Sequence, residues 1–197
     1  LLDRRLQLNV AAFTTKYKDI QLLIQRGVSP TFENAGDARI KGIEVEAQAV
    51  IADGLRLNAS AGYIDANYTR VDDPTAVIRI DSDLPKVAKW TAHVGPEYRL
   101  NLANESSITL RADYFYKSKV ASDAENTPEL YSRSVGVVDL SATYALPGDD
   151  ISLTIGGKNV FNERFVGNGT NQLAGAGMLF ATYNRPAEWY ATLRFKM

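Results

Sequence analysis

The last stretch of the sequence alternates apolar and polar residues so regularly that it constrains the chain to one kind of secondary structure. Between Glu188 and Met197, one side of a strand carries only apolar side chains, namely Trp189, Ala191, Leu193, Phe195 and Met197. The other side carries Glu188, Tyr190, Thr192, Arg194 and Lys196. A period of two is typical of a β-strand with two chemically different faces. Seven further stretches repeat it, so the sequence predicts an all-β fold of antiparallel strands.

Composition excludes several other classes of protein. No run of residues approaches the roughly 18 to 20 consecutive apolar residues that a membrane-spanning helix needs, so a chain of this kind crosses a membrane only as strands. The formal net charge is -1 with a pI near 5.9, and acids and bases are interleaved, which argues against a nucleic-acid partner. The 197 residues contain no cysteine, so neither a disulfide framework nor a thiolate metal site is expected. The first residues do not resemble a signal peptide, and we expect either that one was removed or that further sequence precedes them.

Eight strands are predicted, and no helix. They span about residues 5–25, 31–51, 55–68, 86–100, 107–117, 135–145, 151–161 and 188–197. Most of the connections alternate between tight turns and long loops, the longest at 71–85, 118–134 and 162–187, while a short link at 26–30 joins two strands expected to project well past the membrane. Outer-membrane barrels combine short periplasmic turns with long extracellular loops. We therefore expect a multi-pass protein of the outer membrane of a Gram-negative cell, with lipid as its surroundings.

The two faces of the predicted strands differ in charge. The outward set in the early strands carries none: Leu6, Leu8, Val10, Ile43, Val45, Ala47, Ala49, Ile51, Leu55, Leu57, Ala59, Ala61 and Tyr63. A charge on a lipid-facing position costs about 2–4 kcal/mol at the bilayer midplane, so this segregation is what insertion requires. Outward aromatic residues also gather near both strand ends, as expected of interface belts. A soluble sandwich also alternates, but its exterior would be the polar face.

The inward face predicts a polar lumen. We expect it to be lined by Glu44, Glu46, Arg56, His93, Arg111 and Asp113. His93 is the only histidine, and no second His or Cys lies within metal-ligand spacing, so neither a metal site nor a catalytic residue is predicted there. Paired carboxylates such as Glu44 and Glu46 are interpreted as lumen charge that arginines on the same face balance.

Three segments together resemble the C-terminal part of TonB-dependent outer-membrane receptors. The first is 34–46, which reads NAGDARIKGIEVE, and the second is 157–165, which reads GKNVFNERF. The third is 183–186, YNRP, followed by the final strand. The opening strand from Leu8 to Gln21 is similar to the one that precedes the Asn-Ala-Gly segment in that family, so the resemblance covers essentially the whole chain.

The resemblance implies a 22-stranded barrel filled by an N-terminal plug, of which this chain, 1–197, supplies the last eight strands. The implied activity is energy-coupled uptake of a ferric siderophore or a similar scarce nutrient, without enzymatic chemistry or a resident cofactor. The implied partners are the N-terminal strands and plug of the parent protein, the TonB complex through that plug, and the barrel-assembly machinery through the last strand. The family commonly ends on Phe or Trp, whereas Met197 stands here.

The last long loop contains the candidate ligand residues. Its glycine-rich run 167–177 lacks the lysine and the strand-to-helix context of a phosphate loop, so it is interpreted as a mobile lid or ligand rim. Asn and Gln amides offer donors and acceptors, and aromatic rings stack on aromatic or catecholate groups. The predicted ligand residues are Asn168, Asn171, Gln172, Phe180 and Tyr183.

Two other functions remain open at this point. Eight strands can close on themselves as a small structural or adhesive barrel, because such an interior is just filled by side chains. A barrel hydrolase is disfavoured, since the sequence shows no Ser and Asp arrangement around the single histidine.

Overall fold

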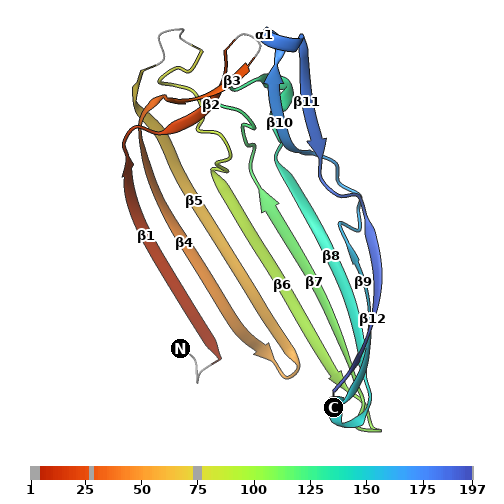
Figure 1. Ribbon diagram of the computed structural model, residues 1–197. Helices are drawn as coiled ribbons and strands as arrows, with labels where there is room; N and C mark the ends of the chain where they lie inside the picture. Colours follow the sequence, from red (N-terminus) through yellow and green to blue (C-terminus); the bar gives the residue numbers. More distant parts are fainter. Residues whose placement is uncertain (1–4, 27–28, 73–76, 197) are drawn as a thin grey trace.

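An eight-stranded antiparallel sheet dominates the computed structural model, which describes residues 5–26, 29–72 and 77–196. The order across the sheet is β1, β4, β5, β6, β7, β8, β9, β12. Their bounds are β1 Leu6–Tyr17, β4 Gly36–Ala52, β5 Leu55–Val71, β6 Trp90–Asn101, β7 Ser107–Lys117, β8 Val135–Ala145, β9 Ile151–Lys158 and β12 Glu188–Phe195. Figure 1 shows one curved wall of tilted strands, with the start of β1 and the end of β12 toward its lower side. The all-β prediction is confirmed.

The strand register places the alternating residues on two consistent faces. Leu8 lies opposite Ala47, which lies opposite Ala59, which lies opposite Val94. At the far side, Leu153 pairs with both Tyr144 and Leu193. Apolar positions therefore meet apolar positions in every neighbouring pair, and we call this side the apolar face and the opposite side the polar face.

The apolar face is uncovered. Large side chains on it are strongly exposed, including Val10 at 60%, Ile155 at 58% and Trp189 at 71%. No described element packs over this face, as a second sheet would in a soluble sandwich. A contiguous apolar surface that extends over all eight strands needs an apolar environment. Within the described ranges, no helix is both long and apolar enough to cross a membrane.

The aromatic residues occupy both ends of this face. Tyr63 and Trp90 lie directly opposite each other, with ring centroids 4.6 Å apart, at the end where the long connections lie. Tyr98, Tyr144 and Phe195 lie toward the end with the tight turns, the first paired with Leu55 and the second with Ile108. We call these two ends the loop end and the turn end.

The first two predicted strands are wrong in the half of each that lies nearest the loop end. The stretch 5–25 is not one strand, because β1 ends at Tyr17 and β2, Gln21–Arg26, begins after a break at 18–20. Likewise 31–51 divides into β3, Ser29–Asn34, and β4, with Ala35 between them. The β2–β3 hairpin bends across the loop end instead of projecting past it (Figure 1).

The backbone shows why the chain bends here. Asp19 has φ 52°, and Gly36 has φ 135°, a value that L side chains rarely adopt. A Cβ on Gly36 would also lie 2.0 Å from the carbonyl oxygen of Arg70. Ile20 donates its N–H to Gly36 and accepts from Ala35, which fixes the bend. The glycine of the Asn-Ala-Gly segment is therefore required by close backbone approach.

The loop end has a hydrophobic core of its own. The hairpin buries Leu22 and Ile24 against residues from four other segments: Ala35, Ala38, Tyr68, Ile78, Leu84 and Ala124. These come from the tops of β4 and β5 and from the connections after β5 and β7. Packing of this kind removes apolar surface from water, so the long connections form a compact roof.

The last long connection contains regular structure that the sequence pattern did not predict. Strands β10, Val166–Gln172, and β11, Met178–Tyr183, form a hairpin capped by the short helix α1, Leu173–Ala176. Two 3₁₀ turns, η1 Pro128–Leu130 and η2 Pro147–Asp149, also occur. Figure 1 shows the β10–β11 hairpin rising above the wall at the loop end. The prediction of no helix was wrong for these short segments.

Two other predicted strand limits, at residues 86 and 161, lie in turns. Strand β6 begins at Trp90, since Lys86 has a left-handed φ of 65°. Strand β9 ends at Lys158 rather than 161, because Asn159 and Asn162 have φ values of 49° and 53°. The buried Asn159 amide donates to the carbonyls of Glu163 and Arg185 and accepts from the N–H of Glu163, at 2.9, 3.1 and 2.9 Å. The GKNVFNERF motif is thus a turn organised by one asparagine.

The sheet is open. Among the described residues, β1 pairs only with β4 and β12 pairs only with β9, so each leaves one edge unpaired. A self-contained eight-stranded barrel would pair β1 with β12, and this arrangement argues against that alternative. Met197, the departure noted at the chain end, lies outside the described residues.

Candidate functional site

Three of the predicted lumen residues meet on the polar face of β6 and β7. Nε2 of His93 lies 2.8 Å from Oδ1 of Asp113. Arg111 donates to both carboxylate oxygens, from Nε to Oδ2 at 2.6 Å and from a terminal nitrogen to Oδ1 at 2.9 Å. Such two-pronged pairing is the strongest geometry available to a guanidinium and a carboxylate. Asp113 is consequently the centre of a rigid polar cluster.

Two residues that were not predicted shape this cluster. A Cβ on Gly95 would lie 2.6 Å from Oδ1 of Asp113 and 3.0 Å from Nε2 of His93, so only glycine leaves room for the contact. Phe115 stacks on the His93 ring, with centroids 4.6 Å apart and planes at 16°. A glycine inside a strand pattern signals close approach of another group, and this signal was available in the sequence.

Charge alternates along the neighbouring row of the polar face. Arg56 lies opposite Glu97, and Glu97 lies opposite Arg111, with 3.6 Å between Glu97 Oε2 and a terminal nitrogen of Arg111. Glu44 and Glu46 occupy the same face on β4, opposite Gly62 and Ser60. The six predicted residues therefore share one face, but Glu44 and Glu46 stand apart from the His93–Asp113–Arg111 cluster.

A pocket of about 290 Å³ opens at the loop end. It is formed by the β2–β3 hairpin, the connections after β5 and β7, and β10. Its apolar lining includes Leu22, Leu23, Pro30 and Pro85, and its polar lining includes Lys86, Asp123, Glu125, Asn168 and Asn171. Ligand sites commonly combine apolar walls with a few converging polar groups. This roof pocket contains two of the five predicted ligand residues.

Hydrogen bonds join the walls of the roof pocket. Nζ of Lys86 donates to Oδ1 of Asn168 at 2.5 Å. Nδ2 of Asn171 donates to Oε2 of Glu125 at 2.5 Å and to Oγ1 of Thr127 at 3.0 Å. The β10–β11 hairpin, interpreted from sequence as a mobile lid, is therefore held to both other long connections by its asparagines.

The charges in the roof pocket are mixed. Partial burial of its ammonium group lowers the pKa of Lys86, and the nearby Asp123 carboxylate acts in the opposite sense. Asp123 accepts from the backbone N–H and the hydroxyl of Thr127, which organises the start of η1. The pocket thus presents one cation beside amide groups, with carboxylates that already accept hydrogen bonds.

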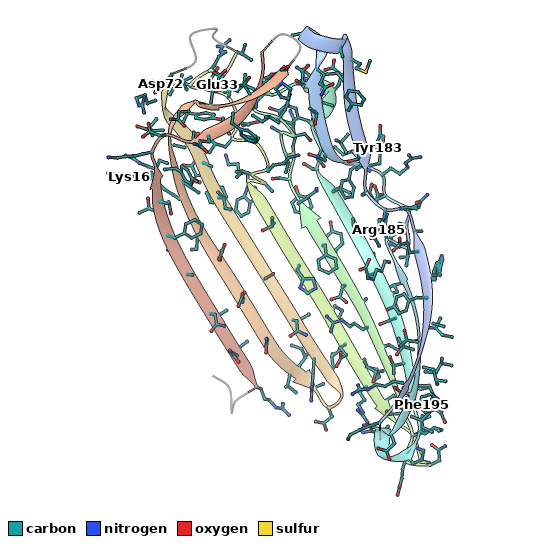
Figure 2. All side chains as sticks on the ribbon, in the orientation of Figure 1. Lys16, Glu33, Asp72, Tyr183, Arg185 and Phe195 are labelled. Atoms are coloured by element: carbon teal, nitrogen blue, oxygen red, sulfur yellow. The ribbon has the colours of Figure 1, made fainter. Side chains whose placement is uncertain are left out.

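The other three predicted ligand residues lie outside the roof pocket. Gln172 ends β10, and Phe180 and Tyr183 lie on β11, with 50% and 58% of their surface exposed. The guanidinium carbon of Arg164 lies 5.1 Å from the Tyr183 ring centroid. Figure 2 shows Tyr183 at the base of the hairpin. A similar contact places Nζ of Lys119 at 3.7 Å from the Tyr131 ring centroid. The loop end therefore carries two cation–aromatic pairs that lie outside the pocket lining.

A larger hollow of about 490 Å³ lies on the apolar face. Its walls include Leu55, Tyr98, Leu110, Leu140, Ile155 and Trp189. These side chains belong to the surface that requires an apolar environment, so we do not regard this hollow as a site for a soluble ligand. Throughout the described part of the chain, no group of three or more His, Cys, Asp or Glu residues is arranged to hold a metal ion.

The sequence pattern missed the residues that the bend of β2–β3 brings to the pocket. Leu22, Leu23 and Pro30 were assigned to strands or a turn extending away from the wall, and Lys86 to a strand. Their contact with β10 depends on long-range packing at the loop end, which periodicity does not encode.

A family model described as "TonB dependent receptor-like, beta-barrel" matches residues 1–160. Among characterised proteins, the metal-pseudopaline receptor CntO of Pseudomonas aeruginosa is 28% identical over 167 residues, which cover 84% of this chain and 22% of that protein.

Solved structures show the same fold. The ferric yersiniabactin uptake receptor FyuA from Yersinia pestis aligns with a TM-score of 0.81 and 19% identity, over 98% of this chain and 28% of the other. The siderophore receptor PiuA from Acinetobacter baumannii aligns with a TM-score of 0.75 and 21% identity, over 99% and 26%. This chain therefore spans about a quarter of the length of the proteins that it matches.

Proposed function

Because the chain belongs to the TonB-dependent receptor-like β-barrel family, we propose that it forms the C-terminal barrel portion of a transporter in the outer membrane of a Gram-negative cell. The transporter takes up a ferric siderophore or a related metal chelate by an energy-coupled mechanism. The family match over residues 1–160 carries this proposal, and the open sheet with one uncovered apolar face supports it.

The remaining parts of the barrel come from a longer protein in this proposal. Unpaired strand edges within a bilayer leave backbone groups without hydrogen bonds, at a cost of several kcal/mol for each group. The free edges of β1 and β12 are accordingly completed by further strands. An N-terminal plug fills the barrel and contacts the TonB complex, and β12 presents the signal to the barrel-assembly machinery.

The polar face lines the interior of the proposed barrel. Glu44, Glu46 and Arg56 supply charges that are not consumed by ion pairs with other described residues. The His93–Asp113–Arg111 cluster is already satisfied within the wall. We assign the first three to contact with the plug or the passing ligand, and the cluster to stiffening of the wall.

The roof pocket forms the proposed ligand site together with two exposed aromatic residues of β11, Phe180 and Tyr183, which we call the rim. Lys86 supplies a positive charge for an anionic chelate, while Asn168 and Asn171 offer amides for its polar groups. Phe180 and Tyr183 provide exposed rings for stacking, and Gln172 ends β10 at the tip of the same hairpin, directly after the pocket residue Asn171. At about 290 Å³ the pocket holds one arm of a chelate, with the rest directed toward the rim. No residue is assigned a catalytic role.

The test uses the full-length protein that contains this chain. Binding of a ferric tris-catecholate, a ferric tris-hydroxamate and a zinc aminocarboxylate chelate is measured by quenching of intrinsic fluorescence. For the chelate that binds, Lys86→Ala and Asn171→Ala should each weaken affinity roughly tenfold. Arg79→Ala, which removes an exposed loop cation outside the pocket, should leave affinity unchanged.

Uptake in cells separates transport from binding. Iron-limited cells expressing the protein should accumulate the labelled chelate only when the TonB complex is intact. Accumulation without that complex would contradict energy coupling, and equal affinity in all three variants would remove the roof pocket from the ligand site.

A further inference from the structure

Three basic residues cluster on the apolar side of β1 and β4, near the loop end. Lys16 lies directly opposite Arg39, and Thr14 lies directly opposite Lys41. All of them share the face that carries Ala12 and Ile43. Figure 2 shows Lys16 projecting away from the wall near the upper end of β1. We refer to Lys16, Arg39 and Lys41 as the basic cluster.

The basic cluster begins where the apolar belt ends. Ile43 lies opposite Tyr63, which contacts Trp90, and these residues form the last apolar level of this side. Lys41 and Arg39 precede Ile43 by two and four residues, which places them about 7 and 14 Å closer to the loop end at the usual strand rise. Since Tyr and Trp mark the membrane interface, the cluster stands at the level of lipid headgroups.

Positive charge is in excess at this level. Like charges placed directly opposite each other repel, as Lys16 and Arg39 do. Among the described residues, none of the three cluster members forms an ion pair. Asp65 is the acid in the same rows, opposite Lys41, and it accepts a hydrogen bond from Asn67. One carboxylate therefore faces three cations.

The acidic residues next to the basic cluster form ion pairs with a different cation, Arg70. Arg70 pairs with Asp19 at 3.1 Å, with Asp37 at 2.9 Å, and also with Asp72. The backbone N–H of Asp19 and the guanidinium of Arg70 both donate to Asp37. The excess charge of the cluster thus lacks an intramolecular partner within the described chain.

We propose that the basic cluster binds the phosphate groups of a phosphorylated lipid in the outer leaflet. Lysine and arginine stems lie along an apolar wall while their charged ends reach the interface, and Thr14 adds a hydroxyl between them. The apolar levels of Ala12 and Ile43 continue directly below and hold the acyl chains of the same molecule. That continuity favours a lipid over free phosphate. The inference rests on the proposed outer-membrane orientation and is independent of ligand uptake.

The experiment places the full-length protein in phosphatidylcholine nanodiscs with diphosphoryl lipid A as the probe, and counts retained lipid A by native mass spectrometry. The triple variant Lys16→Gln, Arg39→Gln, Lys41→Gln should retain lipid A at least about tenfold more weakly. A control triple with the same change of charge, Arg79→Gln, Arg133→Gln, Arg185→Gln, should match the wild type. Equal retention by both triples overturns the proposal.

Misfolding of the triple variant would also reduce retention of lipid A, so a variant that should bind more strongly provides a second test. Asp65→Asn removes the one carboxylate in these rows, so it should strengthen retention of lipid A, and unchanged or weaker retention contradicts the proposal. Displacement of lipid A by millimolar inorganic phosphate alone would also overturn it, because the acyl contacts would then be dispensable. Fractionation of cell membranes tests the proposed location separately. Absence of the protein from the outer membrane would contradict the proposed function. Normal location and normal uptake, combined with equal retention of lipid A by both triple variants, would contradict only the proposed lipid site.

Discussion

Asp113 and His93 lie on adjacent strands of the wall, and Oδ1 of Asp113 is 2.8 Å from Nε2 of His93. The same carboxylate receives two donors from Arg111. The side chains of His93 and Asp113 are only 22% and 13% exposed, so water replaces these partners poorly. The cluster therefore couples β6 to β7 through side chains as well as through the backbone ladder.

Removing the central carboxylate should cost more stability than removing the histidine. Asp113→Ala leaves Arg111 and His93 without their shared acceptor and should lower the free energy of unfolding by about 2–3 kcal/mol, whereas His93→Ala should lower it by about 1 kcal/mol. Urea denaturation of the full-length protein in detergent measures both. Glu46→Gln changes a charge on the same face outside the cluster and serves as the control; equal losses in all three variants would mean that the cluster adds nothing specific.

Local alternation was sufficient to predict most of the wall. Residues such as Leu8, Val45 and Leu193 needed only a period of two to be placed on the correct face, because side-chain direction in a strand is set by the backbone itself. The tight turns were found for a similar reason, since Gly54 and the Leu146–Asp150 segment interrupt the pattern at once.

The roof was beyond the reach of the same reasoning. The chain bends at Asp19 and Gly36 because Arg70 and its neighbours on β5 approach closely, and those contacts join residues more than 30 positions apart. Asn168 and Asn171 were singled out as polar loop residues, but their partners Lys86 and Glu125 come from two other connections. Pairings of this kind follow from how the loops pack on one another, which no local period records.

Asn159 should be the most sensitive asparagine in the chain segment from β9 to β12. Asn159→Ala removes three side-chain hydrogen bonds and forces an alanine into the left-handed backbone conformation at φ 49°. The free energy of unfolding should therefore fall by about 2–4 kcal/mol. Asn159→Gly relieves the backbone cost only, so it should lose less. Thermal unfolding separates the two variants, with exposed Asn9→Ala as the control. An alanine variant as stable as wild type would refute this role.

Gly156 lies opposite Tyr190 in the last two strands of the sheet, and its lack of a side chain leaves room for the Tyr190 ring. A Cβ there would lie 2.4 Å from the ring, so Gly156→Ala should destabilise the β9–β12 pairing by about 1–3 kcal/mol through overpacking. Gly167→Ala is the matched control, because its Cβ would meet nothing closer than 3.5 Å. The yield of heat-modifiable folded protein measures the effect. Adding Tyr190→Ser to the Gly156 variant should restore the yield, and failure to do so would assign the defect to something other than the ring.

Tyr131 should make the loop end sensitive to alkaline pH. Burial, and then the hydrogen bond that its phenol donates to Asp83 Oδ2 at 3.0 Å, raise the pKa of Tyr131 to about 12. An unfolded tyrosine titrates near 10, so the folded state holds this proton more tightly. The stabilisation is therefore fully present below about pH 10 and is lost as the pH rises from about 10 to 12.

Tyr131→Phe tests that dependence. The variant loses one hydrogen bond, worth about 1 kcal/mol near neutral pH, and should show a shallower decline of stability between pH 10 and 12 than the wild type. Denaturation midpoints measured at closely spaced pH values provide the comparison, with tyrosinate absorbance at 295 nm reporting ionisation. Tyr17→Phe, at an exposed tyrosine on β1, controls for loss of a phenol in general. If the two variants and the wild type decline in parallel above pH 10, the Tyr131–Asp83 contact does not govern the alkaline stability of the roof.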